Sequence, residues 1–270
     1  MEPTAVENAL ERISQHLRTL KLARMEKALH QQLARAQKEG APTLLAFERL
    51  FDLEANSLIE RRIERRIRES KLPERKLLAD FDFDFQTGVD KDQIMQLATL
   101  GFVQQRQGLI LAGNSGTGKS HIAKALLLIG CQKLYRCRYT RACDMLTDLM
   151  AGLSDDSVAQ KLKAYVNCDI LLIDEVGFDR LEQESARNAA LFFKVIQGRY
   201  CKNTTILTTN IDFKALGDYL GDPVITTALV DRMVHHSVII SIEGPSYRMH
   251  ESKKLNRSTP KKPKSRSQSK

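Results

Sequence analysis

Residues 113–120 constrain this chain more than any other stretch. Their sequence, Gly-Asn-Ser-Gly-Thr-Gly-Lys-Ser, fits the pattern G-x-x-x-x-G-K-[ST] at every fixed position. Glycines let the backbone curl with its N–H groups pointing at phosphate oxygens, the lysine supplies a positive charge for the β- and γ-phosphates, and the serine hydroxyl can ligate Mg²⁺. The sequence therefore predicts a nucleotide site whose binding residues are Gly113, Asn114, Ser115, Gly116, Thr117, Gly118, Lys119, Ser120 and His121.

The segments on either side of this loop suit the same function. The apolar run at residues 109–112 predicts a buried strand before the loop, and residues 121–133 predict a helix after it. The N-terminus of that helix would face the phosphates and favour their negative charge. A phosphate loop between a buried strand and a helix indicates an α/β fold.

A second motif, at residues 169–175, carries two acids at the end of a predicted strand. Four apolar residues, Ile-Leu-Leu-Ile, run directly into Asp174 and Glu175. We expect Asp174 to hold Mg²⁺ through its waters, near Ser120, and Glu175 to orient and polarise a water for attack on the γ-phosphate. An ordinary buried strand that ends in surface carboxylates is the alternative, and the phosphate loop upstream favours the metal site.

Two more polar residues stand beside predicted strands. Residues 204–209 predict a strand that ends at Asn210, whose side chain could contact the γ-phosphate or its attacking water, or could serve as an ordinary turn residue. Arg232 precedes the last predicted strand, residues 238–242. Spacing alone leaves Arg232 two roles: an ion pair with Asp222 or Asp231, or an arginine finger in a neighbouring subunit's site.

The first 76 residues predict helices. Apolar residues recur at helical spacing from about Val6 to Gln37, as one helix or a pair, and a further helix is expected from Thr43 to about Ser70. That last helix carries five arginines around an apolar line, at Arg61, Arg62, Arg65, Arg66 and Arg68. They form either a solvated face with Glu/Arg pairs four residues apart, or a surface that contacts DNA phosphates.

Residues 78–85 follow with alternating phenylalanine and aspartate. We expect this segment to dock the N-terminal helices onto the core. Its aromatic rings could also contact adenine.

The net charge of +9 is concentrated at the C-terminus. Residues 252–270 hold eight cations and no acid, so the rest of the chain carries 9 − 8 = +1. The Ser/Pro/Lys composition of this tail predicts disorder, with a weak nucleic-acid contact or added solubility as its function. The five cysteines form no C-x-x-C pair and are expected as small core residues in a reducing cytoplasm, and the short apolar runs predict neither a signal peptide nor a membrane span.

At this point the chain resembles a known family, the IstB group of AAA+ ATPases. These are helper proteins of bacterial insertion sequences and close relatives of the DnaC helicase loaders. The resemblance runs from about residue 5 to residue 251, and five motifs carry it: residues 113–120, 170–175, 208–210 (Thr-Thr-Asn), 231–232 (Asp-Arg) and 244–248 (Gly-Pro-Ser-Tyr-Arg). Many NTPases share the first two motifs, whereas their combination with the last three is much narrower.

The resemblance implies a fold and a domain arrangement. The fold is α/β, a P-loop NTPase of the AAA+ class with a parallel five-stranded sheet flanked by helices. A small all-α domain at residues 1–76, for DNA or partner binding, would precede the ATPase domain at 77–251 and the tail at 252–270.

The resemblance also implies a function and roles for single residues. The function is ATP- and Mg²⁺-dependent assembly on duplex DNA, selection of target DNA and stimulation of a partner transposase, in the bacterial cytoplasm. The homo-oligomer would hold its ATP sites at subunit interfaces, with Asn210 as the sensor, Arg232 as the finger acting in trans, and Arg248 as a further nucleotide contact.

Three other functions remain open at this stage. A helicase loader would differ in its partner. A small-molecule kinase is disfavoured, because the adjacent Asp174-Glu175 pair suits water as the nucleophile. The third is a nucleotide-binding scaffold that hydrolyses ATP slowly or not at all.

Overall fold

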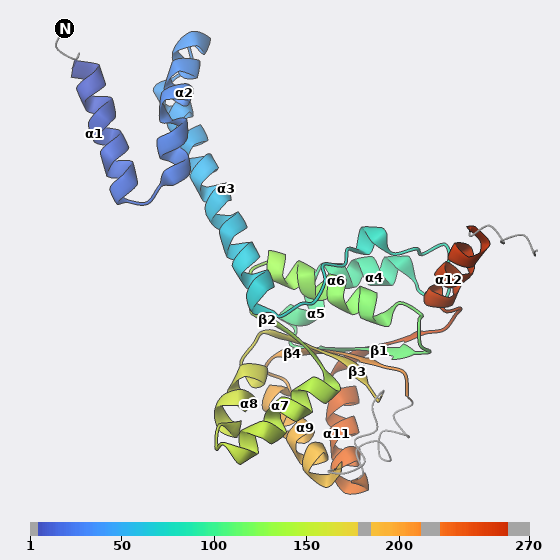
Figure 1. Ribbon diagram of the computed structural model, residues 1–270. Coiled ribbons are helices and arrows are strands. Elements are labelled where there is room, and N and C mark those ends of the chain that lie inside the picture. The colour runs from blue at the N-terminus through green and yellow to red at the C-terminus, as the bar shows by residue number, and fades with distance from the viewer. Residues whose placement is uncertain (1–4, 178–184, 212–221, 259–270) are drawn as a thin grey trace, which may run out of the picture. The chain divides into compact units, whose positions relative to one another are not determined.

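The computed structural model describes residues 5–177, 185–211 and 222–258 (Figure 1). The chain divides into two compact units, Met1–Arg65 and Arg66–Lys270. One helix, α3 (Thr43–Glu69), contributes residues to both units.

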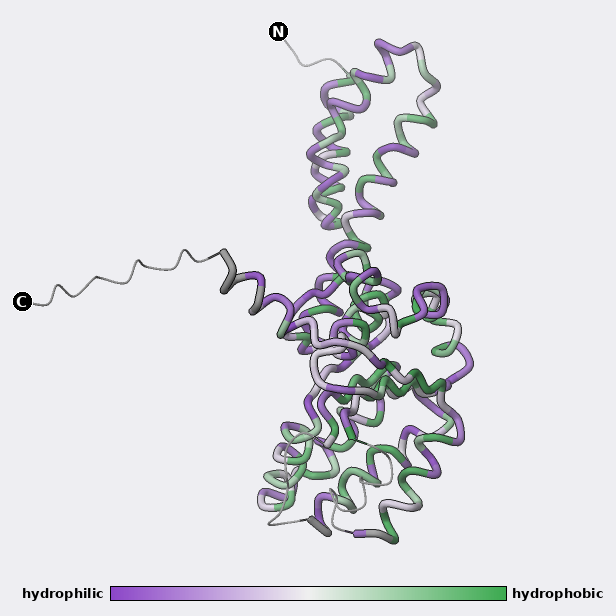
Figure 2. The backbone as a smooth tube through the Cα atoms, turned by 90° about the vertical axis from the view of Figure 1, so that its right-hand side faces the viewer, coloured by the Kyte–Doolittle hydropathy of each residue, from purple (hydrophilic) through white to green (hydrophobic). Residues whose placement is uncertain are grey.

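The first unit consists of α1 (Ala5–Thr19), α2 (Ala23–Glu39) and most of α3. Of the two possibilities that the sequence left open before residue 37, the structure has the helix pair. Its small core is made by Leu17, Met25, Leu29 and Leu50. Figure 2 shows hydrophobic and hydrophilic residues alternating along these helices, as expected for helices that bury one face.

A buried acid joins α2 to α3 within this unit. Glu54 is 7% exposed, and its carboxylate accepts hydrogen bonds from the backbone N–H groups of Arg24 (2.8 Å) and Met25 (3.2 Å) at the N-terminus of α2. The other carboxylate oxygen pairs with Arg61 at 3.1 Å. Arg61 therefore stabilises the helical unit, whatever else it does.

The second unit is built on five parallel strands in the order β2-β3-β4-β1-β5. The strands are β1 (Gly108–Gly113), β2 (Cys137–Arg141), β3 (Ile170–Val176), β4 (Thr204–Thr209) and β5 (Ser237–Ile242). This confirms the predicted parallel five-stranded sheet. Because a parallel sheet is covered on both faces, β1 and the first four residues of β3 are continuous apolar runs, and Figure 2 shows hydrophobic residues concentrated in the centre of this unit.

Helices cover both faces of the sheet (Figure 1). On one face lies α6 (Lys119–Gln132), against which α4 (Lys91–Ala98) packs. On the other lie α7 (Ala142–Ser154), α8 (Val158–Val166), α9 (Ser185–Arg199) and α11 (Pro223–His235), and the core there includes Leu171, Ile173 and Phe192. Two short helices are η1 (Leu78–Asp80) and α5 (Gly101–Gln104), and the last helix of the described chain is α12 (Tyr247–Ser258).

The structure differs from the expectations in three details. Residues 66–76, which were expected in the N-terminal domain of residues 1–76, belong to the second compact unit, where the backbone N–H of Tyr139 in β2 donates to the Ser70 carbonyl at 2.7 Å. The helix α12 continues to Ser258, past the start of the predicted disordered tail, and the remainder of that tail lies outside the described residues. Cysteine 201 is exposed and Cys143 is half-buried, so only three of the five free cysteines are core residues: Cys131, Cys137 and Cys168.

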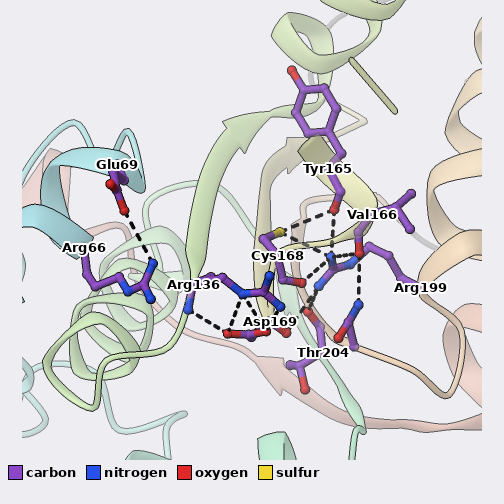
Figure 3. Close-up of polar contacts among 10 residues, drawn as sticks. Arg66, Glu69, Arg136, Tyr165, Val166, Cys168, Asp169, Arg199 and Thr204 are labelled. Atoms are coloured by element: carbon purple, nitrogen blue, oxygen red, sulfur yellow. Dashed lines mark hydrogen bonds and ion pairs between the residues drawn. The ribbon is translucent and has the colours of Figure 1, made fainter. Parts of the chain in front are cut away.

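A buried arginine fixes the start of β3 and β4 (Figure 3). Arg199, at the end of α9, is 1% exposed. Its guanidinium donates to the carbonyls of Tyr165 (2.7 Å), Cys168 (2.8 Å) and Val166 (3.0 Å), and to that of Thr204. Burial lowers the pKa of Arg199, and the nearby carboxylate of Asp169 pairs instead with Arg136 at 2.7 Å.

We expect Arg199→Met to lower the free energy of unfolding by about 3 kcal/mol or more, because several buried carbonyl oxygens lose their donor at once. Arg136→Met is the matched control in the same neighbourhood. The Arg136 side chain is 57% exposed, so the control should cost less than about 1 kcal/mol. Urea unfolding followed by circular dichroism measures both, and equal losses would contradict the role given to Arg199.

Candidate nucleotide-binding site

The predicted phosphate loop joins β1 to α6 at the carboxyl edge of the sheet. A cavity of about 690 Å³ opens there. Its lining includes the loop and most of the predicted site: Ser115, Gly116, Thr117, Gly118, Lys119, Ser120, His121, Glu175, Asn210 and Arg248. The fold thus gathers residues that lie far apart in the sequence into one pocket.

The loop has a backbone conformation that requires glycine. Gly113 and Gly118 have φ of 142° and 96°, in the region that side chains disfavour. A Cβ at Gly113 would lie 2.1 Å from the Ile242 carbonyl oxygen, and one at Gly118 would lie 2.4 Å from the Phe81 ring. Both the turn and the close packing around it therefore depend on these glycines.

Lys119 is held inside the loop. Its ammonium group donates to the carbonyls of Gly113 and Asn114, each at 2.7 Å, and the residue is 8% exposed. The pKa of Lys119 is lowered, first by burial and then by the positive charge of Arg248, while the Asp174 carboxylate raises it. The loop therefore presents a fixed cation to any anion that enters the cavity.

Ser120 and Asp174 form the pair that the sequence predicted for Mg²⁺. The Ser120 hydroxyl donates to Asp174 Oδ1 at 2.7 Å, and Asp174 is 1% exposed. The same carboxylate accepts from the hydroxyls of Thr208 and Tyr139, the latter at 3.3 Å, and lies 3.9 Å from the Lys124 ammonium. The pKa of Tyr139 is raised, first by burial and then by the charge of Asp174, so its hydroxyl remains a neutral donor.

The chemistry of this pair fits magnesium shared with a phosphate chain. Mg²⁺ is usually bound through one or two carboxylates together with substrate phosphates, and it prefers hard oxygen ligands. In the described part of the chain, no group of three or more His, Cys, Asp or Glu side chains could hold a metal without such help. Ser120 and Asp174 are the residues that would hold the ion.

Glu175 reaches the cavity through an irregularity in β3. The pairing of β3 with β4 shifts between Ile173 and Val176, and Glu175 has a φ of 61°. Its backbone N–H donates to the Thr208 hydroxyl at 3.0 Å, while its side chain is exposed at the cavity. Nothing in the local sequence signals this bulge.

Asn210, Arg248 and His121 also line the cavity, with different surroundings. Asn210 is exposed directly after β4. Arg248 belongs to the first turn of α12, which is tied to the loop by a hydrogen bond from the Tyr247 N–H to the Gly116 carbonyl (3.0 Å). The His121 Nε2 atom lies 2.7 Å from the Leu77 carbonyl oxygen.

The structure also places three aromatic rings and a glutamine around the cavity. Phe85 and Tyr247 line the cavity with their ring centroids 5.3 Å apart, and Phe81 makes an edge contact with the His121 ring at 5.5 Å. Gln86 is 2% exposed and donates from Nε2 to the Thr117 carbonyl at 2.9 Å, which holds the segment after Phe81 against the loop. The alternation in residues 78–85 was the signal for Phe81 and Phe85, Tyr247 belongs to the 244–248 motif, and Gln86 had no signal in the sequence.

Arg232 does not line the cavity of its own chain. It lies on α11, stacks over the Phe193 ring at 5.0 Å, and donates to the Gln197 side chain and to the Ala228 carbonyl (2.8 Å). Neither Asp222 nor Asp231 is among its contacts within the described ranges. Of its two predicted roles, the structure does not supply the ion pair.

The five predicted DNA-contacting arginines follow one another along α3. Arg62, Arg65 and Arg68 are exposed, Arg61 pairs with Glu54, and Arg66 lies 3.5 Å from Glu69. Arg61 and Arg66 thus each have an acidic partner on the same helix, seven and three residues away rather than four. A phosphate-contacting role stays a prediction for all five.

A glycine-rich loop after the first strand of a parallel five-stranded sheet, with the acidic strand β3 separated from β1 by β4, defines a P-loop nucleotide-binding protein of the AAA+ class. The chain belongs to the family of IstB-like ATP binding proteins, whose model matches residues 15–255. It is 31% identical over 244 residues to a protein of Bacillus thuringiensis subsp. berliner that is named as an ATP-binding protein of insertion sequence IS232. The match covers 90% of this chain and 96% of the relative. The chain is also 35% identical to the corresponding proteins of IS5376 from Geobacillus stearothermophilus (75% of this chain, 80% of the relative) and IS21 from Pseudomonas aeruginosa (74% and 75%).

Solved structures support the fold. The DnaI structure matches with a TM-score of 0.52 and 19% identity, covering 63% of this chain and 92% of that one. AMPPCP-bound DnaA from Aquifex aeolicus matches with a TM-score of 0.51 and 20% identity, covering 70% and 57%. Among the described residues, no helix has the length and apolar character needed to span a membrane.

Proposed function

We propose that this protein is a Mg²⁺-dependent ATPase of the bacterial cytoplasm that assembles on duplex DNA, selects target DNA and stimulates a partner transposase. The observation that carries the enzymatic part is the geometry at Asp174 and Glu175. One acid is buried against Ser120 beside the phosphate loop, and the next residue is turned out into the same cavity. A site that only binds nucleotide does not require an acid such as Glu175 that is exposed in the cavity.

The residues around the cavity have separate roles in hydrolysis. The loop amides and Lys119 bind the phosphates, and Ser120 with Asp174 holds the metal ion, which supplies charge neutralisation on the phosphate oxygens. Glu175 orients a water and accepts its proton, and Asn210 stands at the adjacent strand end where it can contact the same water or the γ-phosphate. The ring faces of Phe81, Phe85 and Tyr247 suit a planar base, which we propose is adenine.

The site is completed by a second subunit in this proposal. Arg232 lies outside its own cavity and is only half-buried, so it is available to a neighbouring copy. An arginine supplied in trans stabilises the charge that develops on the transferred phosphoryl group. Hydrolysis would then occur in the assembled oligomer and would cause the oligomer to dissociate.

The partners follow from context and from charge. Relatives at 31–35% identity carry names that place them in insertion sequences, whose movement requires a transposase. The chain outside residues 252–270 carries little net charge, so a contact with DNA phosphates requires a local cluster of cations. The exposed arginines of α3 are such a cluster.

Glu175→Gln should retain ATP binding, lose about 100-fold or more of the hydrolysis rate, and accumulate large complexes on DNA, because a neutral amide cannot accept the proton from water. Lys119→Ala should lose both binding and assembly. Gel filtration with duplex DNA and ATP, ADP or no nucleotide measures assembly, and isothermal titration measures binding. Normal turnover by the Glu175 variant would refute its assignment.

Mixing two inactive variants tests the trans role of Arg232. In an equal mixture of Glu175→Gln and Arg232→Ala subunits, about a quarter of the interfaces should combine an intact acid with an intact finger and so recover hydrolysis. The measurement is the ATPase rate of each variant alone and of the mixture on DNA. A mixture as inactive as its components would place Arg232 outside the neighbouring site.

Charge reversal of Arg62, Arg65 and Arg66 to glutamate should weaken duplex binding more than about 10-fold and flatten its salt dependence, because fewer counterions are released. Reversal of three exposed lysines of the second unit, Lys133, Lys163 and Lys202, is a control with the same change in net charge. Fluorescence anisotropy at several salt concentrations measures both variants. Equal effects would move the DNA contact away from α3.

A further inference from the structure

Thr208 of β4 stands opposite both acids of the site. The strands pair Ile173 with Leu207 and Val176 with Thr209, so Asp174 and Glu175 together face the single residue Thr208. This two-to-one arrangement is a β-bulge. The extra residue keeps Val176 in the same core cluster as Ile173.

One hydroxyl group connects the two acids. Thr208 Oγ1 donates its hydrogen to Asp174 Oδ1 and accepts the backbone N–H of Glu175 at 3.0 Å. The residue is 2% exposed, so water does not substitute readily for either bond. A hydroxyl has one donor and two acceptor positions, so it can make both bonds at once, whereas a valine of the same shape can make neither.

The bond to Glu175 holds an unfavourable backbone conformation. A φ of 61° places Glu175 in the left-handed region, which costs energy for a residue with a Cβ and persists only when the surroundings impose it. In a regular strand the residue after Asp174 would point into the opposite face of the sheet, where the core cluster lies. The left-handed turn brings the Glu175 side chain to the cavity instead.

We propose that the Thr208 hydroxyl is a positioning residue for the reaction at this site. It sets the rotamer of Asp174 and keeps Glu175 in the left-handed conformation, so one group places both the metal-binding acid and the acid that activates water. This inference rests on the proposed ATPase function. Thr208 acts through the two acids.

The test compares Thr208→Val and Thr208→Ser with the matched control Thr204→Val. Thr204 lies on the same strand, is 1% exposed, and its hydroxyl has no hydrogen-bond partner among the described residues. Loss of a hydrogen bond that supports a metal ligand typically lowers metal affinity or activity about 10–100-fold. Thr208→Val should therefore lower kcat about 10–100-fold and raise the Mg²⁺ concentration needed for nucleotide binding about 10-fold, with KM for ATP changed less than about 3-fold.

The conservative variant and the control separate positioning from packing. Thr208→Ser keeps the hydroxyl and should remain within about 3-fold of the unmodified protein, and Thr204→Val should leave kcat and the Mg²⁺ requirement unchanged. In a Glu175→Gln background at saturating Mg²⁺, where the weaker metal binding through Asp174 is overcome, Thr208→Val should lower kcat no further, because the residue through which it acts on water is already lost. Equal losses in the two valine variants, no rescue by serine, or a further fall in the double variant would each overturn the proposal.

A crystal structure of Thr208→Val decides the question without reference to activity. We expect the backbone of Glu175 to leave the φ of 61° and the Asp174 carboxylate to change rotamer. If both keep their present conformation, the proposal is wrong. If the unmodified protein hydrolyses no ATP, the proposed function fails, and this structure still decides whether Thr208 positions the two acids.

Discussion

The buried carboxylate of Asp174 is the interaction on which the site depends. A carboxylate taken out of water is costly unless hydrogen bonds or charges replace its hydration. Here the hydroxyls of Ser120, Thr208 and Tyr139 supply the hydrogen bonds, and the Lys124 ammonium, 3.9 Å away, supplies the nearest charge. The carboxylate is therefore held in place beside the phosphate loop before any ligand arrives, which is the preorganisation that electrostatic catalysis requires.

The parallel sheet explains why these groups meet. The carboxyl ends of parallel strands share one edge, so the loop after β1, the acids at the end of β3 and Asn210 after β4 converge although they are widely separated along the chain. The segments of residues 81–86 and 242–248 close around the loop and leave no space for side chains at its glycines. At the opposite ends of β3 and β4, Arg199 of α9 binds backbone carbonyls at the end of α8, just before β3 and at the start of β4, so the acidic strand is fixed at both of its ends.

Much of this arrangement was predictable from the sequence, because its signals are local. The apolar runs before the phosphate loop and before Asp174 each predict a strand. The strand β4 begins and ends where the sequence predicted it, at residues 204 and 209. The bulge at Glu175, the bridging hydroxyl of Thr208 and the Gln86 contact were not predictable, since each depends on a neighbour far away in the chain. Arg61 shows the same limit, because an arginine in a charged run looks solvated until its buried partner Glu54 is known.

In the proposed function, a nucleoside triphosphate and its divalent ion are held between the phosphate loop and Asp174. A crystal structure with a non-hydrolysable ATP analogue and Mn²⁺, located by its anomalous signal, tests this most directly. We expect the ion at about 2 Å from Ser120 Oγ, with Asp174 as a direct ligand or one water away, and the γ-phosphate within reach of Lys119. An ion bound elsewhere, or an analogue that leaves the loop empty, would contradict it.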